Sequence, residues 1–230
     1  MIEARQQRFR GLTTWELTGE GQAGSPAEQT EQLLAEIGRE CEAIGGGLSD
    51  LVFIRFWMRS RAISNEVRAV RRRLIDDKSR TASSSFFSTG VFHGSGDVRI
   101  DALYCRDNRN AVRKPVEFHP PRRYLHYLAR ENGLFTSGMA EPGASVEEQC
   151  RKNLGWLDSA LQAENLQWSD VCELKLFRER GRGIDWEPVL SMLATRYDPE
   201  ATILTLFDVD GLASPEKHLE IELIATRPGD

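Results

Sequence analysis

Two stretches of the chain, 120 positions apart, place apolar residues at the spacing of an amphipathic helix. The first opens at Ser25 and the second at Ser145, and each serine is followed three residues later by a glutamate, Glu28 or Glu148. A serine and a glutamate at this spacing form a capping box, in which the two side chains satisfy free backbone N–H groups of the first turn. The pattern therefore predicts one helix from residue 25 to the glycines at 45–47 and another from residue 145 to about residue 164.

The residues after each helix repeat as well, and they indicate strands and a second helix. Stretches 48–56 and 168–176 each carry Ser-Asp near the start and then largely apolar residues, which is typical of buried strands. Apolar residues at helical spacing predict a second helix in each copy, at 63–76 and 185–196. The remaining strands of the two copies are expected at 10–15, 80–91 and 98–105, and at 133–138, 201–209 and 218–225.

The chain is thus predicted to be an internal duplication, because matching residues stay 120 or 121 positions apart across two helices and three strands. Residues 1–105 form the first unit and residues 124–230 the second. The segment 106–123 is polar and contains prolines, which suits a linker with some extended structure. The expected fold class is α/β (α+β), with two tandem units that each form a mixed β-sheet with two helices on one face.

The segment 93–97, His-Gly-Ser-Gly-Asp, lies between the last two strands of the first unit. Its glycines suit a hairpin turn that joins strands 80–91 and 98–105. Its backbone amides would also suit a bound anion. We favour the hairpin interpretation.

Composition narrows the class of protein. The net charge of −5 argues against a nucleic-acid binder, and the one basic stretch, residues 68–73, is expected to be a solvated face or a subunit contact. The cysteines and histidines show neither CxxC nor HExxH spacing, so no metal site and no cofactor are expected. No apolar run suits a signal peptide or a membrane span, and free cysteines fit a reducing compartment. We therefore expect a cytoplasmic protein without a membrane or nucleic-acid partner.

Several short stretches of the second unit resemble the RidA/YjgF family. They are the segment 132–138 (Asn-Gly-Leu-Phe-Thr-Ser-Gly), Glu148-Gln149, Asn153-Leu154, the segment 168–171 (Trp-Ser-Asp-Val) and the segment 219–222 (Leu-Glu-Ile-Glu). The first unit is similar more faintly, from Ser25 to Cys105, and its segment 87–91 (Phe-Ser-Thr-Gly-Val) resembles a motif of the chorismatases, which belong to the same superfamily. The resemblance implies tandem RidA-like or chorismate-mutase-like units and a homo-oligomer, with a trimer favoured and ligand clefts between units.

The resemblance also implies a set of site residues. Arg80 occupies the place of the family's carboxylate-binding arginine, Tyr124 that of its tyrosine, and Gly138 that of a glycine whose backbone amide faces the ligand. Glu220 occupies the acid–base position, and Glu222 lies on the same strand face two residues later. The alternatives are an exposed or ion-paired arginine, a packed aromatic ring, a strand glycine and an exposed strand glutamate.

Neither unit carries the complete set. The second unit has Ala201 where the first has Arg80, and the first has Arg99 where the second has Glu220. The set is complete only in a composite cleft between the two unlike units, and this cleft is our central prediction.

Three functions are compatible with these residues. The leading one is a small-molecule enzyme, cofactor-independent, that acts on a carboxylate-bearing metabolite by hydrolysis or elimination. Within it, an imine or enamine deaminase competes with a chorismatase-like lyase that releases pyruvate from chorismate, in either case in specialised metabolism. The second is a non-catalytic ligand-binding or interaction protein of the same fold. The third, a ribonuclease, is disfavoured by the negative charge.

Overall fold

The computed structural model describes residues 2–9, 12–75, 80–105, 112–122, 124–130 and 132–227, and its strands form two sheets of six. The first sheet has the order β1-β2-β5-β3-β4-β11 and comprises β1 (Ile2–Phe9), β2 (Leu12–Glu20), β3 (Leu51–Met58), β4 (Ala82–Phe87), β5 (Val98–Cys105) and β11 (Gly211–Leu212). The second has the order β10-β9-β12-β8-β7-β6 and comprises β6 (Arg113–Glu117), β7 (Leu125–Arg130), β8 (Gly133–Thr136), β9 (Val171–Glu179), β10 (Ile203–Val209) and β12 (Leu219–Thr226).

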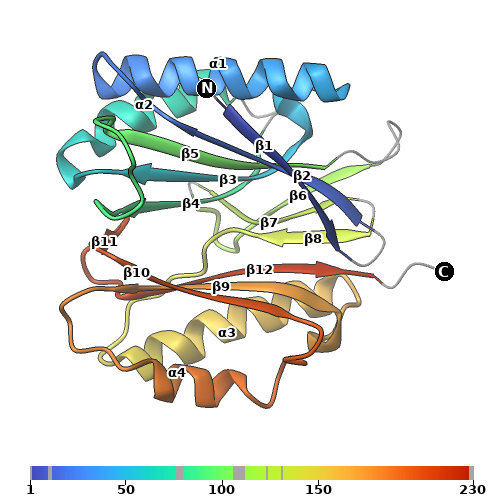
Figure 1. The fold of residues 1–230 in the computed structure, drawn as a ribbon. Coiled ribbons are helices and arrows are strands. Elements are labelled where there is room, and N and C mark those ends of the chain that lie inside the picture. Colours follow the sequence, from blue (N-terminus) through green and yellow to red (C-terminus); the bar gives the residue numbers. More distant parts are fainter. Residues whose placement is uncertain are drawn as a thin grey trace.

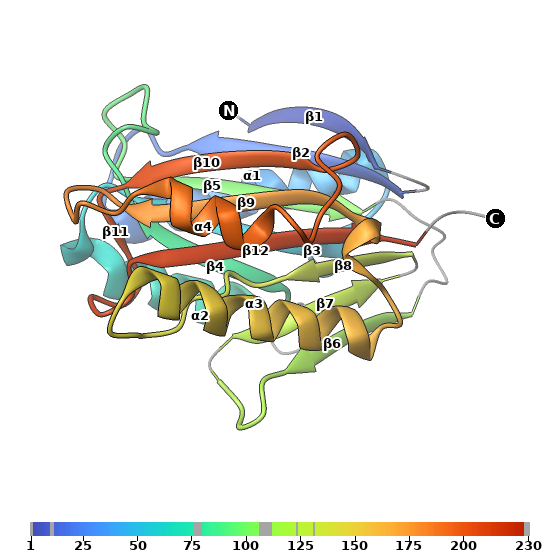
Figure 2. The same ribbon diagram turned by 90° about the horizontal axis from the view of Figure 1, so that it is seen from below.

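Helices cover the outer face of each sheet, so that the molecule has four layers (Figure 1). The helices α1 (Pro26–Ile44) and α2 (Ser64–Leu74) lie on the first sheet, and α3 (Val146–Ala163) and α4 (Trp186–Leu193) lie on the second. The inner faces of the two sheets lie against each other, and the view from below shows the second sheet overlying the first (Figure 2). Each unit thus has a mixed sheet with two helices on one face, and this predicted fold is confirmed.

The first helix of each unit begins where the capping pattern predicts. Ser25 accepts a hydrogen bond from the backbone of Glu28, and the Glu28 carboxylate accepts one from the backbone of Ser25, which completes the capping box. Gly45 ends α1 in the left-handed conformation, with φ of 102°, which glycine adopts without strain. In α3 the Ser145 hydroxyl accepts from Glu148 N–H, but the Glu148 side chain accepts from Ala144 instead.

The strands predicted at 48–56 and 168–176 begin three residues later than expected. Their first residues form single turns of 3₁₀ helix, Leu48–Asp50 and Trp168–Asp170. In both turns an aspartate carboxylate accepts the backbone N–H three residues earlier, Asp50 from Gly47 and Asp170 from Gln167. Such local side-chain bonds compete with strand pairing, and the strand starts only after them.

The hairpin predicted around residues 93–97 is wrong. Strands β4 and β5 are not neighbours, because both pair with β3, β4 in parallel and β5 antiparallel. The crossover through α2 returns the chain parallel to β3, as βαβ connections do, and the following segment must then cross the end of β3 to reach β5. This segment is held by Gln29, whose side chain accepts from the backbone of Asp97 and Val98.

One strand crosses the predicted division into two units, and another forms within the expected linker. Part of the expected linker forms β6, which extends the second sheet beside β7. The two-residue strand β11 comes from the second unit but pairs with Phe86 and Phe87 of β4 in the first sheet. The sequence prediction also missed β1, which pairs with β2 over its whole length.

Four apolar clusters stabilise these layers. One lies between each sheet and its helices. The cluster of the first unit includes Leu34 and Phe56, and that of the second includes Leu157 and Leu176. Two smaller clusters lie between the sheets, one around Phe53 and Phe135 and the other around Trp57, Phe86 and Phe177. Among the helices described, none is long and apolar enough to cross a membrane.

Candidate functional site between the two sheets

Charged side chains enter the space between the sheets because strand residues alternate between two faces. In β3, Ile54 and Phe56 face the helices, whereas Arg55 faces the second sheet. In β9, Leu174 and Leu176 face the helices, whereas Lys175, 120 positions after Arg55, faces inward. The duplication has therefore placed a basic residue at the same point of each inner face.

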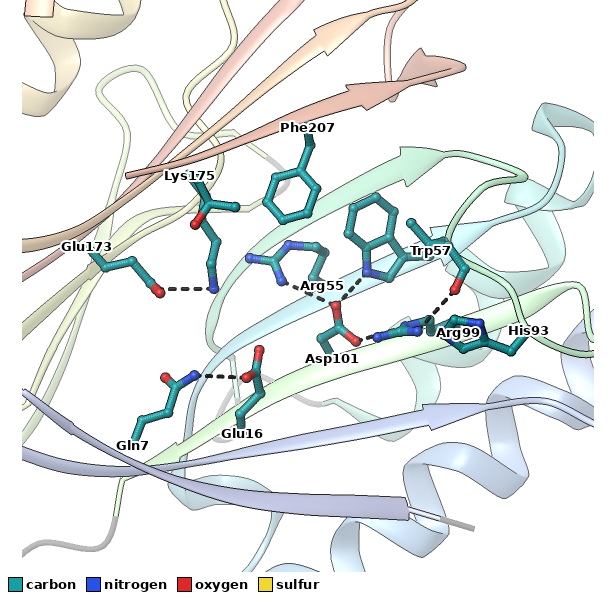
Figure 3. Close-up of a pocket in the computed structure, with 12 residues that line it drawn as sticks. Gln7, Glu16, Arg55, Trp57, His93, Arg99, Asp101, Glu173, Lys175 and Phe207 are labelled. Carbon is teal, nitrogen blue, oxygen red and sulfur yellow. Dashed lines mark hydrogen bonds and ion pairs between the residues drawn. The ribbon is translucent and has the colours of Figure 1, made fainter. Parts of the chain in front are cut away.

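A cavity of about 350 Å³ lies between the sheets and is lined by both units (Figure 3). Its charged side chains from the first unit are Glu16, Arg55, Arg99 and Asp101, together with His93 at the rim, and those from the second are Glu173 and Lys175. Trp57, Val91 and Phe207 supply apolar wall. The volume falls in the range of sites for small molecules.

Arg55 is the centre of a buried ion-pair network that joins the two sheets. Its Nε donates to Oε1 of Glu222 over 3.1 Å, and its Nη2 donates to Oε2 of the same carboxylate. Its Nη1 donates to Oδ2 of Asp101 over 3.3 Å. The Ser84 hydroxyl adds a further hydrogen bond to Glu222. Burial lowers the pKa of Arg55, but the charges of Glu222 and Asp101 outweigh it and hold the pKa above its ordinary value.

Asp101 is surrounded by donors. Trp57 Nε1 donates to it over 2.6 Å, and Thr18 Oγ1 and Arg99 Nε each donate over 3.2 Å. Burial raises the pKa of Asp101, but this effect is outweighed by the charges of Arg55 and Arg99 and by the hydrogen bond from Trp57. The pKa therefore lies below its usual range. Asp101 is therefore an ionised structural anion that orients Arg99 at the cavity wall.

Lys175 and Glu173 form the opposite wall of the cavity. Both side chains are buried, and Lys175 Nζ lies 3.2 Å from Oε2 of Glu173. They also line a small side pocket that Glu222 closes. Figure 3 shows this pair across the cavity from Gln7 and Glu16.

The predicted acid Glu220 is buried between the sheets, so the alternative of an exposed strand glutamate is wrong. Burial and the charge of Glu222 together raise the pKa of Glu220 well above its ordinary value. No described side chain hydrogen-bonds its carboxyl group, which lies directly against Gly138. Glu220 does not line the cavity, whereas Glu222, on the same face of β12, lines its side pocket.

Gly138 lies at the seam between the units. Its backbone N–H donates to the carbonyl of Ser83 in β4 over 3.3 Å, and Ser83 N–H donates to the Ser137 hydroxyl over 3.0 Å. The Gly138 amide is therefore directed at the first unit in this structure. The seam brings together the second unit's Glu220 and the start of β4, which follows Arg80.

Arg80 forms an ion pair, as one of the alternatives for it stated. Both Nη atoms of its guanidinium donate to the two carboxylate oxygens of Glu117 in β6, at the molecular surface. The Arg80 guanidinium, which was expected to bind a ligand carboxylate through two hydrogen bonds, thus binds the carboxylate of Glu117 instead. Arg80 lines neither the cavity nor its side pocket.

Tyr124 is half-buried and packs edge-on against Phe118, with ring centroids 5.2 Å apart. Its hydroxyl accepts a hydrogen bond from Arg122 over 3.4 Å. Burial raises the pKa of Tyr124 above its ordinary value. The structure therefore brings Gly138 and Glu220 together and leaves Arg80 on the surface, whereas Tyr124 packs against the apolar cluster between the second sheet and its helices.

The segment 93–97 does bind an anion through its backbone, although a carboxylate of the protein provides it. The N–H groups of His93 and Gly94 each donate over 2.8 Å to the Glu20 side chain. Within the described parts of the chain, no group of three or more His, Cys, Asp or Glu side chains is placed to hold a metal ion.

Sequence reasoning missed the residues that line the cavity. The signal was a charged residue at an inward position of an otherwise apolar strand, Arg55 between Ile54 and Phe56 and Lys175 between Leu174 and Leu176. The same offset that revealed the duplication would have paired them.

Comparison with solved structures finds one match over nearly the whole chain. A chorismatase crystal structure superimposes with a TM-score of 0.68 at 17% identity, covering 96% of this chain and 79% of its own. The chain has the fold of a chorismatase. No protein-family model matches the sequence, and no curated protein matches it either.

Single-unit structures align with half of the chain. A YjgF/YER057c/UK114 family member from Mycobacterium tuberculosis covers 50% of this chain and 100% of its own, with 20% identity and a TM-score of 0.43. A YjgF family protein from Neisseria meningitidis covers 52% of this chain and 98% of its own, with 21% identity and a TM-score of 0.44. The predicted resemblance to the chorismatases is confirmed as a resemblance of fold.

Proposed function

We propose that this protein is an enzyme that binds a small, carboxylate-bearing metabolite in the cavity between the sheets and breaks it down by hydrolysis or elimination. The observation that carries the proposal is the cavity itself, which is lined by charged groups from both units and has the size of a small-molecule site. A structural core would fill this space with apolar side chains, as the neighbouring clusters do.

The substrate carboxylate has two candidate partners. Arg99 uses Nε for Asp101 and Nη1 for the carbonyl of Val91, and its Nη2 has no hydrogen-bond partner within the described residues. Lys175 has three donors and one nearby carboxylate, that of Glu173. We assign Arg99 and Lys175, rather than Arg55, to substrate binding, because Arg55 is already saturated by Glu222 and Asp101.

The proposed source of the proton is Glu220. Its carboxyl group does not line the cavity, so the proton would pass by way of its neighbour Glu222, which lines the side pocket. A carboxyl group whose pKa is raised by burial stays protonated near neutral pH and can donate its proton to a substrate. In a chorismatase-like reaction this proton would go to the methylene carbon of the enol ether, and water would add to the resulting cation to give a hemiketal. The hemiketal would break down to pyruvate and the alcohol, its hydroxyl proton passing to the departing oxygen. The proton released by the attacking water would restore the acid.

The alternative is a protein that binds the same ligand without turnover. It is favoured by the position of Glu220, which does not line the cavity. It is favoured as well by the pairing of Arg80 with Glu117, which leaves the predicted composite site without a free carboxylate binder.

One assay separates these functions. The protein is incubated with chorismate and with imines generated from amino acids, and pyruvate and ammonia are measured. We expect turnover of one substrate class. KM should increase about tenfold or more in Lys175→Met and in Arg99→Met. The control Arg72→Met, which alters an exposed arginine on α2, should have unchanged kinetics. Binding without product would support the ligand-binding alternative, and the absence of both binding and product would overturn the proposal.

A further inference from the structure

The wall of the cavity formed by β1 and β2 has hydrogen-bond acceptors that lack donors. Gln7 Nε2 donates to Oε2 of Glu16 over 2.8 Å, which fixes the orientation of the Gln7 amide. The other amide atom, Oε1, is buried and has no hydrogen-bond partner. A buried acceptor without a partner costs free energy, and native structures contain few of them.

Glu16 is the second acceptor of this wall. Its carboxylate lines the cavity, and among the residues described no lysine, arginine or histidine forms an ion pair with it. Every other acidic side chain around the cavity has a cationic neighbour: Asp101 has Arg55 and Arg99, and Glu173 has Lys175. Among the described acids that line the cavity, Glu16 is therefore the one without an ion pair, and its cross-strand partner, Arg5, is exposed.

A third polar group lies on the same face of these strands. Thr14 pairs with Gln7 across the two strands and precedes Glu16 by two residues, so its side chain points to the same side. The Thr14 hydroxyl is buried and has no hydrogen-bond partner. Gln7 and Glu16, which line the cavity, form what we term the hairpin wall, and Thr14 lies behind them on the same face.

Arg99 lies at the other end of the same face. Glu16 is paired with Leu103 in the register of β2 and β5, and Arg99 is four residues before Leu103. The two Cα positions are thus separated by roughly 13 Å along the strands. Figure 3 shows Glu16 and Arg99 on either side of Asp101, so a ligand between them has an anionic wall at one end and a cationic one at the other.

We propose that the hairpin wall is a subsite for a primary ammonium group, and that the ligand is a zwitterion with its carboxylate at Arg99. An ammonium group brings three donors and a positive charge, which matches the charge of Glu16 and the open acceptor of Gln7. A hydroxyl group brings one donor and no charge, and it would leave the charge of Glu16 unpaired. The inference rests on the proposed function, because it takes the cavity to be the substrate site. Among the candidate substrates it favours those derived from amino acids over chorismate, which carries no amino group.

The test uses two compounds of the same shape that differ in charge. The probes are 4-(aminomethyl)benzoate, which carries an ammonium group, and 4-ethylbenzoate, in which a methyl group replaces it. Isothermal titration of the full chain measures both dissociation constants. We expect the ammonium compound to bind at least about tenfold more tightly, a difference in line with a charge-assisted hydrogen bond.

Substitutions assign the difference to the hairpin wall. In Glu16→Gln, which keeps the shape and removes the charge, the ratio of the two constants should fall close to one while 4-ethylbenzoate binds as before. Glu42→Gln, which removes an exposed charge on the helical side of the first sheet, should keep the wild-type ratio. Gln7→Met, which removes the open acceptor, should lower the ratio of the two constants in part. Thermal unfolding confirms that each variant is folded.

The possible failures are distinguishable. If both probes bind equally to the wild type, or if Glu16→Gln keeps the preference for the ammonium compound, the subsite is refuted and the carboxylate site stands. If neither probe binds and no assayed metabolite is turned over, the proposed function falls, and the subsite falls with it.

Discussion

The carboxyl group of Glu220 occupies the space that a side chain at Gly138 would need: a Cβ built on Gly138 would lie 1.6 Å from Oε1 of Glu220. The glycine is thus required by the position of the acid rather than by its own backbone conformation. Segment 137–138 belongs to the second unit but bonds to Ser83 of the first, so the position of Glu220 depends on the contact between units.

Gly138→Ala is expected to displace Glu220. Because the added methyl group and the carboxyl group cannot both fit, we expect a loss of about 1–3 kcal/mol in stability and a fall in kcat of at least about tenfold. Urea unfolding and steady-state kinetics measure the two effects. The control is Gly155→Ala in α3, where nothing lies within 4 Å of the added Cβ. That variant should be more stable by about 0.5–1 kcal/mol and fully active, and a fully active Gly138→Ala would refute the role of Glu220.

The raised pKa of Glu220 predicts how stability depends on pH. The folded state keeps a proton that the unfolded state releases near pH 4.3, so this group stabilises the fold at low pH and the contribution is lost as the pH rises toward the folded pKa. Glu220→Gln cannot ionise. Its melting temperature relative to the wild type should therefore increase between pH 5 and pH 8. A difference that is constant over this range would show that Glu220 ionises normally in the fold.

Removing one partner of the buried ion pair should destabilise the protein strongly. Arg55→Met leaves Glu222 buried without its cation, and we expect a loss of about 3–5 kcal/mol in the free energy of unfolding, measured with urea. The double variant Arg55→Met with Glu222→Gln removes both charges and should recover part of this loss. Arg72→Met, at an exposed position of α2, should change stability by less than about 0.5 kcal/mol. If the double variant is no more stable than Arg55→Met, the two residues are not coupled.

The predicted composite site can be tested through the ion pair of Arg80. If Arg80 releases Glu117 to bind a substrate carboxylate, Arg80→Ala and Glu220→Gln should each abolish turnover, and Glu117→Gln should lower KM because the competing carboxylate is gone. If the pair only joins β4 and β6, Arg80→Ala and Glu117→Gln should have the same small effect. Steady-state kinetics of the three variants separates these results.

The predicted trimer stays a prediction, and light scattering of the purified chain measures it. Three chains of 26.0 kDa would give about 78 kDa (3 × 26.0). The cavity described above is formed within one chain, so we expect it to bind ligand in any assembly state. A strict monomer would exclude additional sites between chains.

The helices and most strands followed from local sequence signals, because caps and apolar periodicity act over a few residues. The Ser25 capping box and the strand Val98–Cys105 appear where the pattern put them. The order of strands in the sheet did not follow, since nothing local to residues 93–97 reveals that β3 separates β4 from β5. The strand β6 was read as linker because its pattern is almost wholly exposed, as an edge strand allows.

The site could be predicted only in part, for a similar reason. Glu220 and Glu222 were found from the resemblance of single units, and both prove to be buried. The roles of Arg55 and Asp101 depend on partners from another strand or from the other unit, which no single stretch reveals. Arg80 was assigned from its position in one unit, and the carboxylate that occupies it comes from β6, where no strand was expected.

The strand exchange at β11 has a consequence for the order of events during synthesis. The end of the open edge of β4 in the first sheet, at Phe86 and Phe87, is covered by Gly211 and Leu212, which leave the ribosome only after α3, β9 and β10 have been made. Until then the nascent first unit has an unprotected strand edge, the feature through which partly folded chains associate wrongly. We therefore expect this end of β4 to remain unpaired until the second half has been made.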